Sequence, residues 1–276
     1  MQDKLFAPQY ERDEHNWVKF PRDVELRRSL WPSDVFDHPA KANVFMVQEL
    51  ALYMTEPGDI VLDPFAGTGT QLISARDGRR VALIELEDTF RDLIKRTVVN
   101  WREELPELPD VYLYEGDCRQ ELQKIQYQVD AAVFSPPYST TMTNSGIKNE
   151  EDTVGTGRYD FESYSRSPMN ISRLNSFMYG QALDLVFRRL AARIVPGGRV
   201  AVITKDRMNG PRREMLSEPV IKRAQRNGLV FEGEWFKWLA PSTIAKASQT
   251  VAKAAGREVF GAVLDEDLIL FRKPRE

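Results

Sequence analysis

Apolar and polar positions follow one another along this chain in blocks that predict strands separated by helices. Short apolar runs of strand length lie at residues 60–62, 81–84, 111–114 and 131–134. Helical spacing of apolar residues precedes the first run, from Asn43 to Tyr53, and Pro57-Gly58 ends that helix. Strands and helices that alternate in this way favour an α/β fold with a mainly parallel sheet.

The second half continues the pattern. It predicts helices at 182–194 and 215–226, the first stopped by Pro196-Gly197-Gly198, and strands at 200–204, 229–235 and 264–271. Residues 1–37 read as a polar arm whose aromatic residues Trp17, Phe20 and Trp31 we expect to pack on the domain. Two stretches, 139–176 and 240–261, lack such a pattern, and loops this long in a compact domain are usually functional or disordered.

The run Ile60-Val61-Leu62 leads into Asp63-Pro64-Phe65-Ala66-Gly67-Thr68-Gly69-Thr70, and helical spacing resumes from Gln71 to Arg76. Glycine tolerates positive φ and carries no Cβ, so Gly67 and Gly69 let the backbone approach a ligand closely. A tight turn at a helix N-terminus offers unpaired N–H groups to a carboxylate or phosphate. The segment therefore predicts a nucleotide-cofactor turn.

Acidic residues follow the next two strands. Residues 81–84 end in Glu85, roughly twenty residues after the turn, where this architecture places an acid on the ribose hydroxyls. Residues 111–114 stop at Gly116-Asp117-Cys118, and Asp117 can accept from an adenine amine. An Asp after a strand is also a common turn former or helix cap. We expect the cofactor role because this strand is the third in a glycine-turn domain.

Ser135-Pro136-Pro137-Tyr138 follows the apolar run 131–134. Two consecutive prolines hold φ near about −65° and remove two backbone donors, so the carbonyl oxygens there can only accept. An exocyclic base amine must give both hydrogens to acceptors before its lone pair can point at a methyl donor, and a Ser hydroxyl with a proline carbonyl supplies two. Tyr138 can stack on the base. A base inside a duplex cannot reach such a pocket, so the target nucleotide must flip out.

Together these elements resemble the amino-methyltransferase family of DNA modification enzymes, which use S-adenosylmethionine and methylate cytosine N4 or adenine N6. The resemblance covers nearly the whole chain, and it includes His38-Pro39-Ala40-Lys41, similar to the element that closes over the methionine end of the cofactor. Residues 265–273 look like the last sheet strand. The cofactor motif precedes the tetrapeptide, whereas many members with a serine-type tetrapeptide have the reverse order. Circular permutation leaves the site intact in space, so the implied reaction is the same.

The resemblance implies one class I methyltransferase domain over residues 1–276, with a Rossmann-like, doubly wound, mainly parallel sheet of seven strands and helices on both faces. The cofactor residues that it implies are His38, Lys41, Asp63, Pro64, Phe65, Gly67, Thr68, Gly69, Thr70, Glu85, Asp117 and Cys118. The catalytic residues that it implies are Ser135, Pro136, Pro137 and Tyr138. In this family an Asp at the first tetrapeptide position is usual for adenine and a Ser is commoner for cytosine. We therefore expect cytosine N4, with adenine N6 as the alternative.

The cysteine count decides between mechanisms. One cysteine excludes internal disulfides and a cysteine-based zinc cluster, two histidines argue against a histidine-rich site, and no metal is expected. Methylation at cytosine C5 needs a thiolate in the catalytic loop, whereas Cys118 lies beside the cofactor strand. We expect Cys118 to be a small packing residue whose backbone N–H faces the cofactor. Direct attack by an exocyclic nitrogen needs only orientation and two acceptors.

The net charge of −3 is divided unevenly. Residues 1–138 carry 16 Lys plus Arg against 25 Asp plus Glu, and residues 139–276 carry 22 against 16. The basic half follows the tetrapeptide, so phosphate contacts with double-stranded DNA are expected there. Candidates are Arg158, Arg166, Arg173, Lys205, Arg207, Arg212 and Arg213, with 139–176 and 240–261 as DNA-recognition or lid segments.

Composition agrees with one compact enzyme domain, since 276 residues at 42% hydrophobic can bury a sizeable core. No apolar run reaches the length of a membrane span and the N-terminus lacks the apolar core of a signal peptide, so we expect a cytoplasmic enzyme. It would be a monomer or homodimer, with a restriction endonuclease as a candidate partner. Two other hypotheses stay open: an RNA base methyltransferase, which would normally bring an RNA-binding module, and a non-catalytic DNA-binding relative, disfavoured because both motifs look intact.

Overall fold

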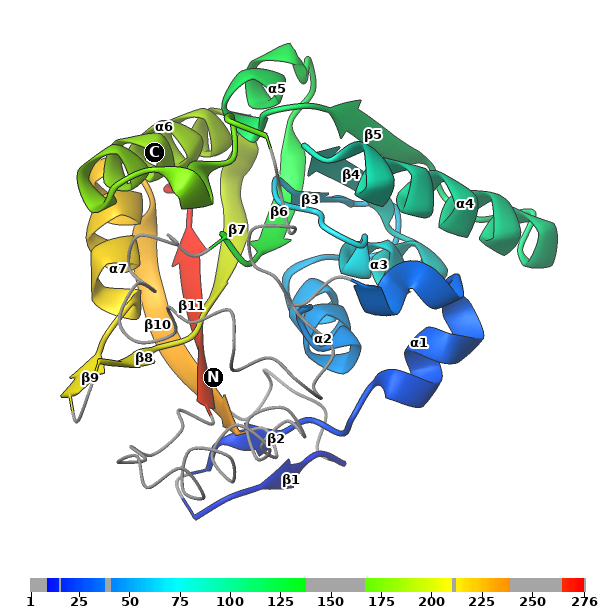
Figure 1. Cartoon of the computed structure of the whole chain (residues 1–276), viewed down its shortest axis with the longest axis horizontal. Helices are drawn as coiled ribbons and strands as arrows, with labels where there is room; N and C mark the ends of the chain where they lie inside the picture. The colour runs from blue at the N-terminus through cyan, green and yellow to red at the C-terminus, as the bar shows by residue number, and fades with distance from the viewer. Residues whose placement is uncertain are drawn as a thin grey trace, which may run out of the picture.

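The computed structural model describes residues 9–14, 16–37, 41–137, 167–209, 212–238 and 265–275. Within these ranges one sheet has the strand order β1-β2-β10-β11-β7-β6-β3-β4-β5 (Figure 1). Its centre is a parallel set made of β3 (Ile60–Asp63), β4 (Arg80–Glu85), β5 (Val111–Glu115), β6 (Val129–Phe134) and β7 (Ile194–Thr204). β11 (Asp265–Arg272) inserts antiparallel between β7 and β10 (Val230–Trp238), which completes the central seven strands expected from the sequence.

The N-terminal arm extends this sheet. β2 (Val18–Lys19) pairs in parallel with the end of β10, and β1 (Glu11–Arg12) pairs antiparallel with β2. Phe20 and Trp31 are buried in the core as expected, whereas Trp17 is half-buried. The sequence predicted packing for this arm but not its strands, because two-residue strands carry no readable alternation.

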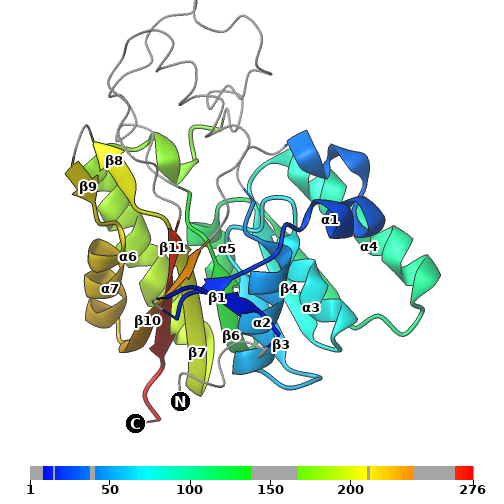
Figure 2. The ribbon, with the colours of Figure 1, turned by 90° about the horizontal axis from the view of Figure 1, so that it is seen from below.

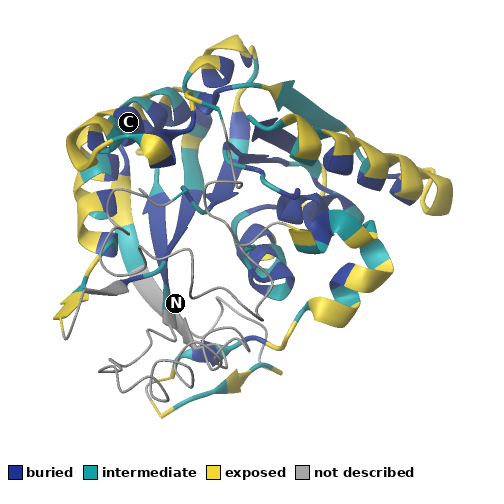
Figure 3. Ribbon diagram, viewed as in Figure 1, coloured by how far each residue is buried: buried dark blue, intermediate teal, exposed yellow. Residues whose placement is uncertain are grey.

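Helices cover both faces of the sheet (Figure 2). One layer consists of α1 (Val24–Leu30), α2 (Val44–Met54), α3 (Ile73–Arg76) and α4 (Asp88–Glu104), together with the 3₁₀ turns η2 (Ser33–Asp37) and η3 (Thr70–Leu72). The other consists of α5 (Cys118–Lys124), α6 (Ser176–Arg193), α7 (Ser217–Arg226) and the 3₁₀ turn η6 (Ile171–Arg173). Successive strand residues point to opposite layers, as Val61 and Leu62 do, because side chains alternate along a strand. The inner strands β3, β4 and β6 are therefore almost entirely buried, whereas β5 at the edge is half-exposed, and the outer faces of the helices are exposed (Figure 3).

Several boundaries differ from those predicted. α6 begins at Ser176 and not at residue 182, because the side chain of Asn175 accepts from the Met178 N–H at 2.9 Å and caps the helix there. β7 begins at Ile194 and runs through the Pro-Gly-Gly segment that was expected to separate helix from strand. Gly198 permits this because a Cβ there would lie 2.6 Å from the Asp130 carbonyl oxygen on β6. The helices α4 and α5 and the hairpin β8 (Arg207–Asn209) with β9 (Arg212–Glu214) were not predicted.

The remaining predicted elements agree with the structure to within three residues at each end. The segment 240–261 and most of 139–176 lie outside the described residues. A search of the described helices for one long and apolar enough to cross a membrane finds none.

Candidate active site

The residues singled out by the sequence converge at one edge of the sheet. β3, β4, β5 and β6 are parallel neighbours, so the segments that follow their carboxyl ends meet there. A pocket with an empty volume of about 560 Å³, partly open to solvent, lies at this edge. Predicted residues that line it are Pro64, Phe65, Gly67, Glu85, Asp117, Cys118, Ser135 and Pro137. The pocket therefore has both predicted elements, the glycine turn and the serine-proline segment, in its wall.

The two glycines of the turn have different surroundings. Gly67 (φ +51°) lines the pocket and donates its N–H to Glu85 Oε2 at 2.6 Å. Gly69 (φ +76°) donates to the Ala66 carbonyl at 2.8 Å and does not line the pocket. A Cβ on Gly69 would lie 2.9 Å from Ile94 Cγ1 on α4. Turn geometry and packing against α4 therefore require glycine at position 69, whereas Gly67 is the glycine that a ligand in the pocket can approach.

Glu85 is held at the end of β4 by two backbone donors. Its Oε2 accepts from Gly67 and its Oε1 from the Glu87 N–H at 2.8 Å. The side chain is almost fully buried, and this burial raises the pKa of the carboxyl to about 7. Both lone-pair-rich oxygens are fixed in the pocket wall, where a pair of vicinal hydroxyls could donate to them.

Asp63 supports the turn from beneath. Its Oδ1 accepts from the Phe65 N–H at 2.8 Å, and the residue is 8% exposed and does not line the pocket. Burial, with the nearby Glu85 carboxylate adding to it, raises the pKa of Asp63 to about 7. Asp63 and Glu85, which both bond to the glycine turn, therefore have pKa values near 7.

Asp117 is both a helix cap and a pocket residue. It precedes α5, and its Oδ1 accepts from the Arg119 N–H at 2.8 Å. The Arg119 side chain forms a 2.6 Å ion pair with Oδ2 and donates to the Met169 carbonyl at 3.0 Å. The capping role and the predicted cofactor position are thus combined in one side chain. Burial raises the pKa of the adjoining Cys118 thiol, which keeps it protonated and unreactive.

The serine-proline segment follows β6. Ser135 and Pro137 are half-buried in the pocket wall, and Pro136 is buried behind them. Phe134 packs under the turn with its ring centroid 5.8 Å from that of Phe65. Tyr138 lies outside the described residues. Ser135 and Pro137 therefore line the same pocket as Glu85 and Gly67.

Comparisons with known proteins bear on the fold and on residues 5–96. Residues 5–96, which include the glycine turn and Glu85, match the N6_N4_Mtase family model, described as DNA methylase. TrmN from Thermus thermophilus superposes with a TM-score of 0.52 at 18% identity, over 85% of this chain and 50% of that one. The chain has the class I methyltransferase fold. The resemblance and the fold class predicted from the sequence are both confirmed.

Two further relatives are methyltransferases by name. A tRNA (guanine(10)-N2)-dimethyltransferase of Methanothermobacter thermautotrophicus is 33% identical over 96 residues, which is 34% of this chain. The chain spans about a quarter (26%) of the length of that relative. A SAM-dependent methyltransferase of Methanosarcina mazei superposes with a TM-score of 0.46 at 11% identity, over 81% of this chain and 96% of that one. The name of that Methanosarcina protein contains SAM, which is S-adenosylmethionine, the cofactor predicted from the sequence.

The pocket of this methyltransferase fold includes residues that sequence reasoning missed. After Glu85 it is lined by Leu86, Glu87 and Phe90, and from a distant segment by Met169, Asn170 and Ile171. Phe90 could have been found, because an apolar residue soon after the ribose acid is placed to cover a planar base. Residues 169–171 belong to the segment 139–176, predicted as a recognition or lid segment, but no local signal marks them as pocket wall, since they lie at and just before η6 and not at a strand end. Ile84, Phe90, Met169 and Ile171 supply apolar walls to the pocket.

Other predicted cofactor residues lie around the turn. Thr68 and Thr70 are buried and outside the pocket lining, and Thr70 Oγ1 accepts from Arg27 at 3.2 Å. Lys41 lies 5.8 Å from the ring centroid of Phe36, and burial, with repulsion from Arg27, lowers its pKa to about 8. His38 lies outside the described residues.

Five of the seven predicted basic residues lie in the described part of the chain, in η6 or after β7. Lys205 follows β7, the neighbour of β6, and leads into the β8–β9 hairpin, whose backbone contains Arg207. Arg173 in η6 and Arg212 in β9 are exposed. Arg213 instead donates from Nε to the buried Asp206 carboxylate at 2.7 Å, so it also ties the hairpin to β7. Arg158 and Arg166 lie outside the described residues.

Proposed function

We propose that this chain transfers a methyl group from S-adenosylmethionine to the exocyclic amine of a nucleobase in a nucleic acid. The observation that carries the proposal is that Ser135 and Pro137 line the same pocket as Gly67 and Glu85. A methyl-donor element and an amine-acceptor element must lie this close, because direct transfer needs the two reacting atoms in near contact.

The cofactor half of the proposal follows from the groups in the wall. Glu85 is placed to accept from the ribose hydroxyls, and Asp117 from the adenine amine, with Ile84 and Phe90 against the ring. Gly67 lets the turn approach the methionine end, and its N–H is already directed into this region by its bond to Glu85. When bound, S-adenosylmethionine supplies a methyl carbon whose bond to sulfur breaks as the amine nitrogen bonds to it.

The acceptor half uses oxygens alone. The Ser135 hydroxyl and a carbonyl of the proline segment accept the two amine hydrogens, which directs the nitrogen lone pair toward the methyl group. Positive charge then develops on the nitrogen, and these acceptors bind it more strongly than the neutral amine. One amine proton is finally released to an acceptor oxygen or to water. No covalent enzyme intermediate is required, and the buried, protonated Cys118 agrees with that.

Double-stranded DNA is the substrate that we propose first, with cytosine N4 as the acceptor. The family match over residues 5–96 is described as DNA methylase, and the tetrapeptide begins with Ser and not Asp. A neutral Ser both accepts from an amine and donates to a neighbouring ring nitrogen, as cytosine allows. Phosphates would be held by the basic residues of η6, β7 to β9 and the predicted recognition segments. Adenine N6 uses the same geometry and is the alternative within DNA.

A tRNA substrate is the second candidate, because the curated relative is a tRNA (guanine(10)-N2)-dimethyltransferase. Guanine N2 is also an exocyclic amine on a planar ring, so the same two acceptors would orient it. The discriminating experiment treats DNA and, separately, tRNA with purified protein and S-adenosylmethionine carrying a deuterated methyl group, and identifies labelled nucleosides by mass spectrometry. N4-methylcytosine in DNA is expected. N6-methyladenine would change the base, label in tRNA alone would change the substrate, and no label would refute the proposal.

Cofactor binding is tested separately. Glu85→Ala should weaken S-adenosylmethionine binding by about 1 to 3 kcal/mol in calorimetry, because the ribose hydroxyls lose their acceptor. Glu107→Ala, an exposed acid after α4 and outside the pocket, is the matched control and should bind normally. Equal affinity of wild type and Glu85→Ala would overturn this assignment.

A further inference from the structure

Arg27 on α1 is a fully buried cation that bonds to Thr70 of the glycine turn, 43 positions later in the sequence. Its side chain is 1% exposed and ranks among the largest fully buried side chains of the described residues. The guanidinium lies 5.7 Å from the ring centroid of Trp31, and burial lowers its pKa. A buried guanidinium is retained only where acceptors are fixed around it, so its partners show what it organises.

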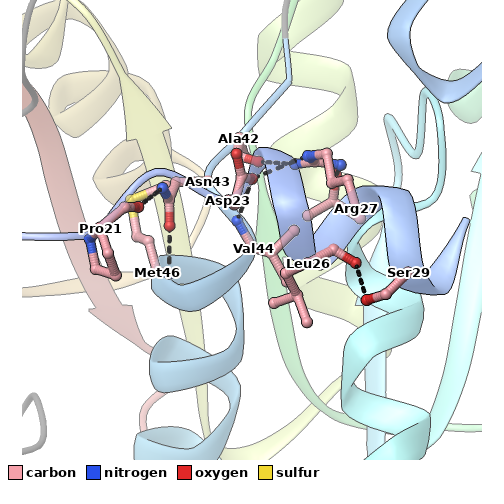
Figure 4. A network of polar contacts seen from close by, with 10 residues as sticks. Pro21, Asp23, Leu26, Arg27, Ser29, Ala42, Asn43, Val44 and Met46 are labelled. Atoms are coloured by element: carbon pink, nitrogen blue, oxygen red, sulfur yellow. Dashed lines mark hydrogen bonds and ion pairs between the residues drawn. The ribbon is translucent and has the colours of Figure 1, made fainter.

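Three separate segments supply those acceptors. Arg27 Nε donates to Asp23 Oδ2 at 2.9 Å and Nη2 donates to the Ala42 carbonyl (Figure 4). Arg27 Nη1 donates to Thr70 Oγ1 at 3.2 Å. Thr70 ends the glycine turn, three residues after Gly67, and Ala42 directly follows Lys41. One planar fork therefore joins α1, the segment before α2 and the cofactor turn.

A second set of bonds makes the arrangement stiff. Asp23 Oδ2 also accepts from the Val44 N–H at 2.9 Å, at the first residue of α2. Asn43 caps α2 by accepting from Met46 at 3.2 Å, and its Nδ2 donates to the Pro21 carbonyl at 2.8 Å. Each residue of the segment 42–44 is thus hydrogen-bonded to a residue between 21 and 27: Ala42 to Arg27, Asn43 to Pro21 and Val44 to Asp23 (Figure 4). Arg27 adds the bond from this assembly to the turn.

We propose that Arg27 is a positioning residue for the methionine end of the cofactor pocket, holding Thr70 and residues 42–44 in one fixed relation to the glycine turn. The inference rests on the proposed cofactor. Arg27 does not line the pocket, so it acts through the turn and not by contact with the ligand. Its charge also bears on Lys41: burial and repulsion from Arg27 lower the pKa of that ammonium, while the carboxylates of Asp23 and Asp37 act in the opposite direction.

The main test compares two neighbouring arginines of α1. Arg27→Lys keeps the buried positive charge, but one ammonium on a flexible stem cannot bridge three acceptors in the geometry of the fork. Calorimetry with S-adenosylhomocysteine should show affinity about tenfold weaker than wild type, the loss expected when a hydrogen bond from a charged group is broken. Arg28→Gln removes an exposed arginine paired with Glu25 and should bind within about twofold of wild type.

A purely structural role predicts a different result. In that case Arg27→Lys would lower the melting midpoint yet bind S-adenosylhomocysteine normally when measured well below that midpoint, and the proposal would be wrong. Turnover adds a second readout: KM for S-adenosylmethionine should rise about tenfold while kcat changes little and KM for the nucleic acid stays constant. Absence of binding by wild type would instead refute the proposed function.

Thr70 provides a test that does not depend on how Arg27 variants fold. Thr70→Val removes the hydroxyl that accepts from Arg27, and Thr70→Ser keeps it. Thr70→Val should weaken binding several-fold and Thr70→Ser should restore most of it. Adding Thr70→Val to Arg27→Lys should cause little further loss, because the lysine variant has already lost the bond to Thr70. Full additivity of the two losses, or equal binding by the Val and Ser variants, would overturn the proposal.

Discussion

Replacing Asp63 with Asn should make the ligand-free protein more stable near neutral pH. Asp63 is buried and accepts from the Phe65 N–H at 2.8 Å, and this N–H can donate equally to an Asn Oδ1. The substitution therefore removes a buried charge and keeps the bond. Burial and the Glu85 carboxylate raise the pKa of Asp63 from 3.8 to about 7.

The size and sign of the effect follow from proton linkage. Between pH 3.8 and about 7 the folded chain holds a proton on Asp63 that the unfolded chain has released, so the free energy of unfolding falls as pH rises through this window. The whole window corresponds to about 4 kcal/mol at about 1.4 kcal/mol per pH unit. Asn does not titrate, but its buried NH₂ group needs a partner and costs about 1 to 3 kcal/mol.

The pH dependence isolates the charge from the amide cost. Relative to wild type, Asp63→Asn should gain about 3 kcal/mol of stability between about pH 5 and pH 8, since only the stretch up to about 7 contributes. Urea unfolding monitored by tryptophan fluorescence at both pH values measures this difference, and Trp31 and Trp101 are buried reporters. The exposed Asp110→Asn is the control and should show no such change. A stability difference for Asp63→Asn that does not vary with pH would refute the reasoning.

Three further predictions concern single residues of the site. Gly69→Ala should lower the free energy of unfolding by about 2 kcal/mol or more beyond the loss in Gly58→Ala. Gly58 is the control because it has a similar positive φ (+91°), but a Cβ there would meet open space. Equal losses of the two variants in urea unfolding would contradict the argument that Gly69 packs against Ile94. Ser135→Ala should reduce single-turnover methyl transfer by about 100-fold or more with cofactor affinity unchanged in calorimetry, and a parallel loss of both would remove its assigned role. Cys118→Ala should keep methyl transfer within a few-fold of wild type, and an inactive variant that binds cofactor normally would argue for a covalent mechanism.

Local patterns determined the half of the site that lies at strand ends. The run Ile60 to Leu62, the glycines after it and Glu85 could be placed from sequence, because strand period, positive-φ turns and the next strand's terminal acid are all local properties. Parallel pairing then had to bring those ends to one edge, as it does for Gly67, Glu85, Asp117 and Ser135. The central seven-stranded sheet followed from the resemblance carried by the same motifs.

Tertiary structure alone decided the rest of the pocket and its support. Met169 to Ile171 complete the wall from beyond a long segment, and Arg27 on α1 joins Thr70 and Ala42 across 43 and 15 positions of sequence. Such contacts depend on which faces pack together, and a single sequence contains no periodicity that reports a partner so far away. From the sequence alone, Arg27 is one of several charged residues in a polar arm and would be expected on the surface. Only the burial of α1 against the turn makes its charge a constraint, because water no longer competes for its three acceptors.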